Sequence, residues 1–342
     1  MKGLAYLFLL IVGITMVVPL VWMFSTSLKE EAAVASFPPE FIPREQVQLE
    51  YDGRKRKVAE VEYQGQLVEA LELRIFKDQR DMLLLDTMKT ITVPVSQVHY
   101  KKQVVLHWEN YKDAWYAMTV KVFLFGKFRI KSAFSLFFLN SLYVAICVTL
   151  GQVITSSLAA YAFARLRFPF RDQLFLGYLA TMMVPGVVTM IPVYALLGQL
   201  DLVNTYAALV VPGIFSAYGT FLLRQFFMGI PKELEDAALI DGANHLQIYA
   251  QVILPLAKPA LATLTTFTFL GSWNGFMWPL IVAHDLELKT LPIGLAAFQG
   301  LHQTEWTLLM AASLVVMVPV ILVFLFNQRY FVRGIVMSGI KG

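Results

Sequence analysis

Long apolar stretches recur along the chain and are separated by shorter polar segments. A helix that crosses a bilayer needs about 20 mainly apolar residues. Six stretches meet that requirement, and none contains Asp, Glu, Lys, Arg or His in its interior. The sequence therefore predicts six transmembrane helices, with approximate bounds Leu4–Leu28, Ala133–Ala164, Leu174–Leu200, Leu202–Leu223, Pro259–Ala283 and Thr307–Phe326.

The first stretch also shares features with a secretory signal peptide. Lys2 precedes it, and Ala33-Val34-Ala35 resembles a cleavage site. Its apolar run is longer than the roughly 7–15 residues of a signal core, so we interpret it as a retained anchor. Pro and Gly recur within the other stretches. They fit two alternatives, kinked and closely packed helices or a pathway lined by bent helices.

A polar segment separates the first two apolar stretches. Residues 29–131 hold 17 of the 28 Lys and Arg and 15 of the 24 Asp and Glu. Asp52-Gly53 and Gln64-Gly65 are typical of tight turns between strands. The segment is expected to form a small β-rich domain, which serves either as a spacer or as a dock for a partner protein. The expected strands, all within Glu40–Leu106, cover Gln46–Tyr51, Val58–Tyr63, Leu67–Phe76, Ile91–Val95 and Val104–Leu106.

Lys and Arg residues near the spans indicate the orientation of the chain. If the N-terminus is cytoplasmic, only Lys289 outside the insert falls on the far side. Both termini are therefore expected in the cytoplasm, and the insert outside it. The net charge of +4 and the pI near 9.0 then reflect topology and indicate no nucleic-acid site. The cytoplasmic set is Lys2, Arg165, Arg167, Arg171, Arg224, Lys232, Lys258, Arg329, Arg333 and Lys341.

Composition narrows the classes of function. The chain is 57% hydrophobic and 15% charged, against about 25% charged in an average soluble domain. It has no HExxH, and its histidines all lie in loops, which argues against an intramembrane hydrolase. Ion-coupled carriers commonly use ionisable groups within their spans, and these spans have none. The chain also lacks a GxxxxGK[ST] loop, so a transport motor would reside on another chain.

The longest cytoplasmic segment, Gly229–Lys258, has the pattern of a short helix, a turn and a second amphipathic stretch. Pro231 suits a helix first turn, and the acids that follow it favour the positive end of the helix dipole. Gly242 is placed to end that helix, and His245–Ile253 forms the second stretch. These features alone fit an interfacial helix pair.

A longer pattern in this segment resembles the EAA loop of ABC importer permeases, E-A-A-x3-G-x9-I-x-L-P. The matching residues are Asp236-Ala237-Ala238, Gly242 and Val252-Ile253-Leu254-Pro255, with Asp in place of Glu and Val in place of the first Ile. Other segments are similar to the carbohydrate branch, and most of all to the second, shorter permease subunit of maltose-type importers. They are Asn140-Ser141, Ala160–Arg165, Met182–Pro185, Gly219–Phe227, Gly271–Asn274, Gln328–Phe331 and the terminal Lys341-Gly342. The resemblance covers about Met1–Pro39 and His107–Gly342 and omits the insert.

The resemblance implies a type I ABC importer permease fold. This is an all-α polytopic membrane protein with six transmembrane helices, here with a small β-rich extracytoplasmic insert between helices 1 and 2. The first helix is expected in residues 1–30 and the insert in residues 31–131. Residues 132–342 are expected to form the core permease domain, with the coupling loop at residues 229–258.

The implied function is transport, with no enzyme activity and no cofactor in this chain. The permease is expected to form a heterodimer with a second homologous permease in the inner membrane of a prokaryote. Two ATPase subunits would bind ATP and Mg, and an extracytoplasmic solute-binding protein would deliver a sugar or oligosaccharide. The same architecture for glycerol phosphate or another polyol derivative is one alternative, and a stand-alone secondary carrier or channel is another.

The resemblance also implies roles for individual residues. ATPase coupling falls to Glu235, Asp236, Ala237, Ala238, Asp241, Gly242, Leu254 and Pro255. The outer loop His284–Trp306 is similar to a segment that contacts the binding protein, here through Gly294, Gln299 and Gly300, with a re-entrant surface loop as the alternative. The basic tail Asn327–Gly342 fits a positive-inside anchor or an ATPase contact. Aromatic and amide groups predict a sugar pathway at Tyr218, Trp273, Asn274 and Trp278, although such residues also pack or anchor helices.

Overall fold

The computed structural model describes most of the chain in two compact units. The first unit contains Met1–Ala114 and Phe298–Leu314, and the second contains Trp115–Ala297 and Val315–Gly342. The predicted outer loop and C-terminal tail each fall partly outside the described residues, as does Lys341-Gly342. The described residues are 2–36, 38–124, 127–300 and 304–338.

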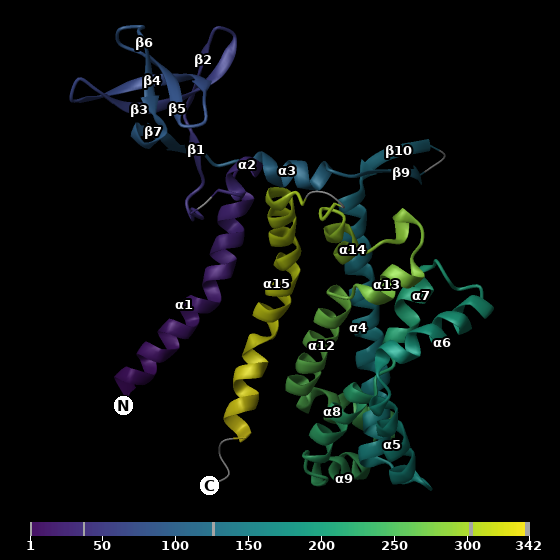
Figure 1. Cartoon of the computed structure of the whole chain (residues 1–342). Coiled ribbons are helices and arrows are strands. Elements are labelled where there is room, and N and C mark those ends of the chain that lie inside the picture. The colour runs from purple at the N-terminus through teal and green to yellow at the C-terminus, as the bar shows by residue number, and fades with distance from the viewer. Residues whose placement is uncertain (1, 37, 125–126, 301–303, 339–342) are drawn as a thin grey trace. The chain divides into compact units, whose positions relative to one another are not determined.

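The first unit begins with an apolar helix, α1 (Lys2–Ser27), as predicted (Figure 1). Its best 18-residue window has a mean hydropathy of 2.6, and no residue of that window is buried within the protein. Such a surface is suited to lipid or to another membrane protein. A four-residue helix, α2 (Glu31–Val34), follows it.

The insert forms a six-stranded antiparallel sheet, as Figure 1 shows. Five strands lie in the order β2-β3-β4-β5-β6, and β7 (Val98–Tyr100) returns to pair with β3 after a 3-10 turn, η1 (Val95–Gln97). The two predicted hairpin turns are confirmed, because all four of their residues have positive φ. The other strands are β2 (Gln48–Tyr51), β3 (Arg54–Tyr63), β4 (Gln66–Ile75), β5 (Gln79–Leu84) and β6 (Thr90–Pro94).

Apolar residues on both faces of this sheet are buried. Ala59 and Val61 of β3 belong to one cluster, whereas Val58 belongs to another. β5 is also buried on both faces, and a strand of this kind lacks a clean alternation, which is why β5 was missed in the sequence. β7 has only three residues, too few to show a pattern. The predicted strand at Gln46–Tyr51 divides at Val47 into β2 and β1 (Arg44–Gln46). β1 pairs with β8 (Lys102–Val104) in a separate two-stranded sheet.

The second unit begins within α3 (Glu109–Tyr116), and a hairpin that the sequence analysis missed follows this helix. Its antiparallel strands are β9 (Thr119–Leu124) and β10 (Lys127–Ser132). The hairpin leads directly into α4 (Ala133–Arg165), a helix of 33 residues. Ser132 caps this helix by accepting a hydrogen bond from the Ser135 N–H at 3.2 Å.

Helices α4, α8 and α12 form the centre of the second unit (Figure 1). α8 (Ala217–Met228) approaches α4 closely, since a Cβ on Gly219 would lie 2.7 Å from Ser156 Oγ. Small residues allow such contact between helices in membranes. Other helices in the chain are α5 (Arg171–Ala180), α6 (Gly186–Gln199), α7 (Tyr206–Val210), α12 (Lys258–Trp273), α13 (Met277–Val282), α14 (Leu291–Ala296) and α15 (Trp306–Ser338), of which α15 begins in the first unit and continues into the second.

In the described parts of the chain, four helices are long and apolar enough to cross a membrane, or six if two bent helix pairs each count as one span. The predicted third span is one of these pairs, bent by 100° where Pro185 precedes α6. The predicted fifth span ends early, because α12 stops at Trp273. A Cβ on Gly275 would lie 3.1 Å from the Ser272 carbonyl oxygen, so the turn before α13 favours glycine.

Candidate functional site

The EAA segment forms a short helix, α9 (Glu233–Ile240), with an acidic first turn. The helix ends at Gly242, whose φ is +85°. The Gly242 N–H donates to the Leu239 carbonyl at 3.0 Å, and the Ala243 N–H donates to the Ala238 carbonyl at 2.9 Å. This pair of bonds is a Schellman motif, and its left-handed position is the one that glycine occupies without strain.

A second helical stretch follows the glycine turn. α10 (His245–Ile248) begins with a capping box, in which Asn244 Oδ1 accepts from the Gln247 N–H at 2.9 Å and Gln247 Oε1 accepts from the Asn244 N–H at 2.8 Å. The chain continues through one π-helical turn, η4 (Tyr249–Ile253), into α11 (Leu254–Leu256). The predicted amphipathic stretch is therefore helical but changes its winding midway.

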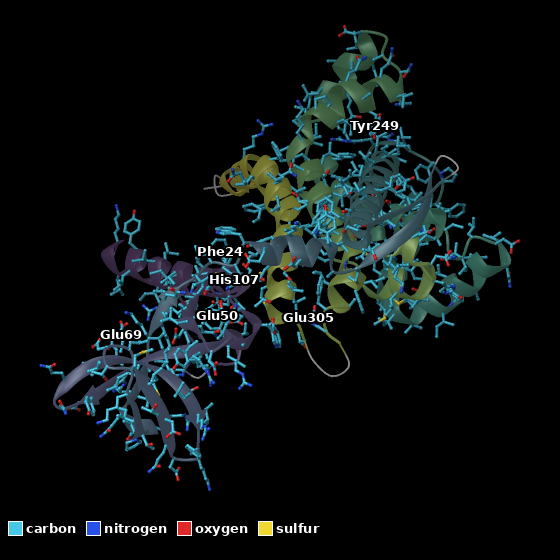
Figure 2. All side chains as sticks on the ribbon, turned by 90° about the horizontal axis from the view of Figure 1, so that it is seen from above. Phe24, Glu50, Glu69, His107, Tyr249 and Glu305 are labelled. Carbon is cyan, nitrogen blue, oxygen red and sulfur yellow. The ribbon has the colours of Figure 1, made fainter. Side chains whose placement is uncertain are left out.

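This second stretch packs against the centre of the second unit. Tyr249, which Figure 2 labels, has its hydroxyl 2.7 Å from Ser157 Oγ on α4. Such packing ties the coupling loop to the helices above it. The buried cluster includes Ala160, Tyr161, Leu223, Phe227, Ile230, Ile248, Tyr249, Ile253, Ala257, Ala260 and Leu264.

Arg165, at the end of α4, joins α9 to the same centre. Its Nε lies 2.9 Å from Glu235 Oε1, and the two side chains are only 3% and 14% exposed. Its Nη2 donates to the Ile230 carbonyl at 2.5 Å and also to the Phe227 carbonyl. The Nε–H is not aimed at the carboxylate oxygen, so this contact is an ion pair without a hydrogen bond. Burial raises the pKa of Glu235, and the Arg165 charge offsets part of that effect.

The opposite face of α9 is open and mixes acidic with apolar side chains. Asp236, Ala237 and Asp241 are exposed, and Ile240 is 87% exposed. On α10, Leu246 is 68% exposed. Sequence analysis did not single out Ile240 or Leu246. The sequence contained a signal for both residues, because each is an apolar residue next to residues of its helix that face the buried cluster.

A cavity of about 480 Å³ lies between the helices of the second unit. Gln152 of α4 and Thr268 of α12 meet at its wall, with Gln152 Nε2 donating to Thr268 Oγ1 at 2.9 Å. Its volume is in the range of small-molecule sites. All its lining residues are uncharged: Val144, Val148, Gln152, Leu209, Gly213, Tyr218, Leu264, Phe267, Thr268, Gly271, Ser272, Gly275, Trp278 and Pro279.

Residues 152–337 match the family described as the binding-protein-dependent transport system inner membrane component. The chain belongs to this family. The matched residues include α9, α12 and most lining residues of the cavity. Permease subunits of ABC importers bind no cofactor themselves, and they are transport components, not enzymes. This permease is accordingly the membrane-embedded component of an ABC importer.

Curated relatives and a solved structure agree with this membership. The permease is 39% identical over 203 residues, 59% of this chain and 73% of the relative, to the arabinooligosaccharides transport system permease protein AraQ of Halalkalibacterium halodurans. It is 39% identical over 233 residues, 68% of this chain and 80% of the relative, to the sn-glycerol-3-phosphate transport system permease protein UgpE of Pectobacterium atrosepticum.

The solved structure is that of a bacterial ABC transporter involved in the import of the acidic polysaccharide alginate. It matches with a TM-score of 0.65 and 21% identity over 96% of both chains. This likeness concerns the fold, and it extends over the sheet-rich N-terminal region because it covers nearly the whole permease. The type I permease fold of the resemblance is thereby confirmed.

The four predicted pathway residues fall in different surroundings. Tyr218 and Trp278 line the cavity, and Trp278 Nε1 donates to the Ala208 carbonyl at 2.9 Å. Trp273 is buried, and its Nε1 donates to the Val316 carbonyl at 3.2 Å. Asn274 is exposed at the end of α12. A role in solute passage stays a prediction for all four, and the geometry favours Tyr218 and Trp278.

Asn140 fixes the start of the outer loop within the second unit. Its Nδ2 donates to the carbonyls of Glu287 and Lys289 at 2.7 and 2.9 Å, and its Oδ1 accepts from the Tyr206 hydroxyl at 2.7 Å. The neighbouring Ser141 Oγ accepts from a loop N–H at 2.7 Å. The Asn140-Ser141 pair, noted above only for its resemblance, thus has a structural role.

The three predicted binding-protein contacts differ in accessibility. Gly294 is buried in α14, where a Cβ would lie 2.4 Å from Phe137 Cδ2. Gln299 and Gly300 are exposed, and Gln299 forms an isolated antiparallel bridge with Thr304. Their contact with a binding protein stays a prediction.

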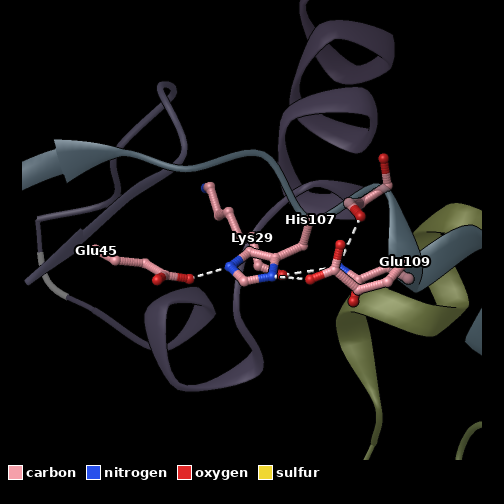
Figure 3. Close-up of polar contacts among 6 residues, drawn as sticks. Lys29, Glu45, His107 and Glu109 are labelled. Atoms are coloured by element: carbon pink, nitrogen blue, oxygen red, sulfur yellow. Dashed lines mark hydrogen bonds and ion pairs between the residues drawn. The ribbon is translucent and has the colours of Figure 1, made fainter. Parts of the chain in front are cut away.

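A charged cluster lies at the base of the sheet in the first unit (Figure 3). His107 Nδ1 is 2.5 Å from Glu109 Oε1, and His107 Nε2 contacts Glu45 of β1. Burial alone would lower the pKa of His107, but the carboxylates of Glu109 and Glu45 outweigh it and raise that pKa. The His107 imidazole therefore joins β1 to the first turn of α3.

Proposed function

We propose that this permease imports an uncharged sugar or oligosaccharide. The observation that carries the proposal is the uncharged lining of the cavity, where amide, hydroxyl and aromatic groups such as Gln152, Thr268 and Trp278 lie together. Sugars suit such a lining because their hydroxyls take hydrogen bonds while their C–H faces contact aromatic rings. The arabinooligosaccharide relative supports the same class of solute.

Glycerol phosphate or another polyol derivative is the second candidate, because a glycerol-3-phosphate permease is equally similar in sequence. A phosphate group in a low-dielectric site needs a cation or several donors beside it. The cavity offers no Lys or Arg among its lining residues. The same reasoning disfavours an acidic polysaccharide, unless the partner permease supplies the cations.

The proposed topology has six spans, with both termini in the cytoplasm and the insert outside. The bent pairs α5–α6 and α10–α12 each count as one of the six, with α10 and α11 on the cytoplasmic side as part of the coupling loop. The distribution of Lys and Arg supports this orientation, and it places α9 at the cytoplasmic surface. The location is then the inner membrane of a bacterium.

The proposed assembly is a heterodimer with a second permease, two ATPase subunits that bind ATP and Mg, and an extracytoplasmic binding protein. The exposed face of α9 supports the docking step. Asp236 and Asp241 offer carboxylates to basic groups of an ATPase, and the exposed side chain of Ile240 offers apolar contact area. Leu254 and Pro255 would hold the end of the loop, and the solute-binding protein would meet Gln299 and Gly300.

The test is purification of the tagged permease with its neighbouring gene products, followed by reconstitution into vesicles. We expect an ATPase subunit to co-purify with the permease. Uptake of a neutral oligosaccharide should require ATP on the side of the vesicle membrane where the ATPase subunits lie. Glycerol phosphate uptake without oligosaccharide uptake would favour the second candidate. ATP-independent uptake with no ATPase in the complex would instead indicate a stand-alone carrier and refute the importer assembly.

A further inference from the structure

A second cavity lies in the first unit, beside the end of α1. It has a volume of about 310 Å³, and we call it the headgroup cavity. The cavity begins directly after α1 along the chain, because Ser27 is the last residue of α1 and Lys29 lines the cavity. Its lining residues are Lys29, Glu30, Ala32, Ala33, Ser36, Glu40, Ile42, Arg44, Glu45, Gln46, Gln48, Lys57 and Lys102.

Some of the charged side chains in this cavity form ion pairs with one another or with His107, and others do not. Glu40 is 2.5 Å from Lys102 Nζ, and this contact lowers the pKa of the carboxyl. Glu45 contacts His107. Among the described residues, neither Arg44 nor Lys57 forms an ion pair within 4 Å of a carboxylate. The Arg44 charge still contributes to the lowered pKa of Glu40, and Lys57 Nζ lies 5.6 Å from the centre of the Tyr100 ring. Two cations thus line a concave polar surface with their charges available to an anion.

Aromatic groups adjoin the headgroup cavity on the side of α1. Lys29 Nζ lies 4.1 Å from the centre of the Trp22 ring and donates to the Glu40 carbonyl at 2.6 Å. The Trp22 and Phe41 rings meet edge to face at 5.0 Å. Trp beside a Lys at the end of a spanning helix is typical of the membrane–water interface. If α1 spans the membrane, these residues place the headgroup cavity at the level of the lipid headgroups.

An apolar groove continues from this point along α1. Its volume is about 510 Å³, and we call it the acyl groove. Phe41 lines the acyl groove, while its neighbours Glu40 and Ile42 line the headgroup cavity. The consecutive residues 40–42 thus contribute to the walls of both spaces. The acyl groove is lined by Leu9, Leu10, Gly13, Ile14, Val17, Val18, Val21 and Phe41.

We propose that the headgroup cavity and the acyl groove together bind one anionic phospholipid of the outer leaflet. Arg44 and Lys57 would take the phosphate and an acyl chain would lie along α1. A free phosphate would use the cations but not the adjoining groove, so the combination favours a lipid. The leaflet, but not the lipid site itself, rests on the proposed topology. The lipid would anchor the base of the insert to the membrane surface.

Native mass spectrometry of the full-length permease, with whatever subunits co-purify, tests this proposal. The complex is titrated with phosphatidylglycerol and with phosphatidylcholine of the same chains. Wild type should retain phosphatidylglycerol in preference. Removing a cation near a headgroup weakens binding about fivefold, so Arg44→Ala with Lys57→Ala should weaken it about 25-fold.

Two further variants separate site binding from bulk charge and from misfolding. Arg54→Ala with Lys55→Ala removes two exposed cations at the hairpin tip, outside the headgroup cavity, and should retain the lipid. Arg44→Lys with Lys57→Arg keeps both charges and should also retain it. Equal retention of the two lipids by wild type, or equal loss in both alanine pairs, would overturn the proposal. A groove filled by the partner permease would appear as no retained lipid, which also overturns it. If no ATPase subunit co-purifies, the importer assembly is refuted, but the retention of phosphatidylglycerol can still be measured and interpreted.

Discussion

Arg165→Ala should detach the coupling helix from the membrane core. The Arg165 guanidinium, at the end of α4, contacts the end of α8, the chain just after it and the start of α9. Its removal leaves the Glu235 carboxylate, which is 14% exposed, without its cation. The Ile230 carbonyl loses its Arg165 donor at the same time, and the Phe227 carbonyl keeps only the Ile230 N–H at 3.0 Å.

The expected cost follows from this burial. Removing one partner of a buried ion pair costs about 3–5 kcal/mol, because the other charge stays in place unpaired. Such a loss shifts the equilibrium between packed and detached α9 by about a hundredfold or more. Glu235→Gln should cost less, since burial already disfavours the charged carboxylate and raises its pKa. Arg165 would then keep both carbonyl acceptors.

Two measurements on the reconstituted importer would test this expectation. Hydrogen exchange should accelerate in residues 233–240 of Arg165→Ala, while exchange in α4 and α12 stays slow. The ATP hydrolysed per solute imported should rise, because α9 no longer moves with the spans. Arg167→Ala is the matched control, since Arg167 is an exposed arginine two residues further on. Wild-type exchange and coupling in Arg165→Ala would refute the reasoning.

Three further predictions concern the glycine turn, the outer loop and the charged cluster. Gly242→Asp places a side chain at φ +85°, which costs about 1–2 kcal/mol. The purified variant should therefore lose the ATPase subunit while it still inserts into the membrane. Asn140→Ala leaves buried polar groups unpaired at about 1–3 kcal/mol each, and limited proteolysis should show faster cleavage near Glu287, whereas unchanged cleavage contradicts the role. The raised pKa of His107 means that its stabilisation is complete below about pH 6.5 and is lost as pH rises through the raised value. Hydrogen exchange at β1 should therefore accelerate with pH in wild type beyond its intrinsic rate, and His107→Gln should remove that excess.

The apolar pattern predicted the membrane helices well where one helix crosses without interruption. α1 and α4 begin and end within a few residues of expectation. It failed where backbone geometry breaks a continuous apolar run. The apolar residues on both sides of Pro185 read as one span, yet the helix axis turns by 100° there. Hydropathy measures transfer into lipid and contains no information on the direction of a helix.

The insert shows a different limit. Its hairpin turns were predictable because Asp-Gly and Gln-Gly pairs carry a local conformational preference. The return of β7 to β3 joins residues such as Val61 and Val98, 37 positions apart. Nothing local marks that pairing, since it depends on how the intervening strands curl. The headgroup cavity likewise draws on α2, β1, β2, β3 and β8, so its charges became a site only in the folded chain.

The two adjacent acids of α9 show where sequence reasoning on the coupling loop had to stop. Glu235 and Asp236 are equivalent in a sequence, and both were assigned to the ATPase. Consecutive residues of a helix point about 100° apart, so only one of them can face the helix's own support. The structure gives that place to Glu235, which meets Arg165, and leaves Asp236 exposed. A docking carboxylate must stay accessible, whereas a carboxylate that transmits motion must be held on both sides. We therefore infer that Asp236 binds the ATPase, while Glu235 carries the movement of the ATPase to α4. Exchanging the two residues, Glu235→Asp with Asp236→Glu, would then impair ATPase binding less than the transmission of movement.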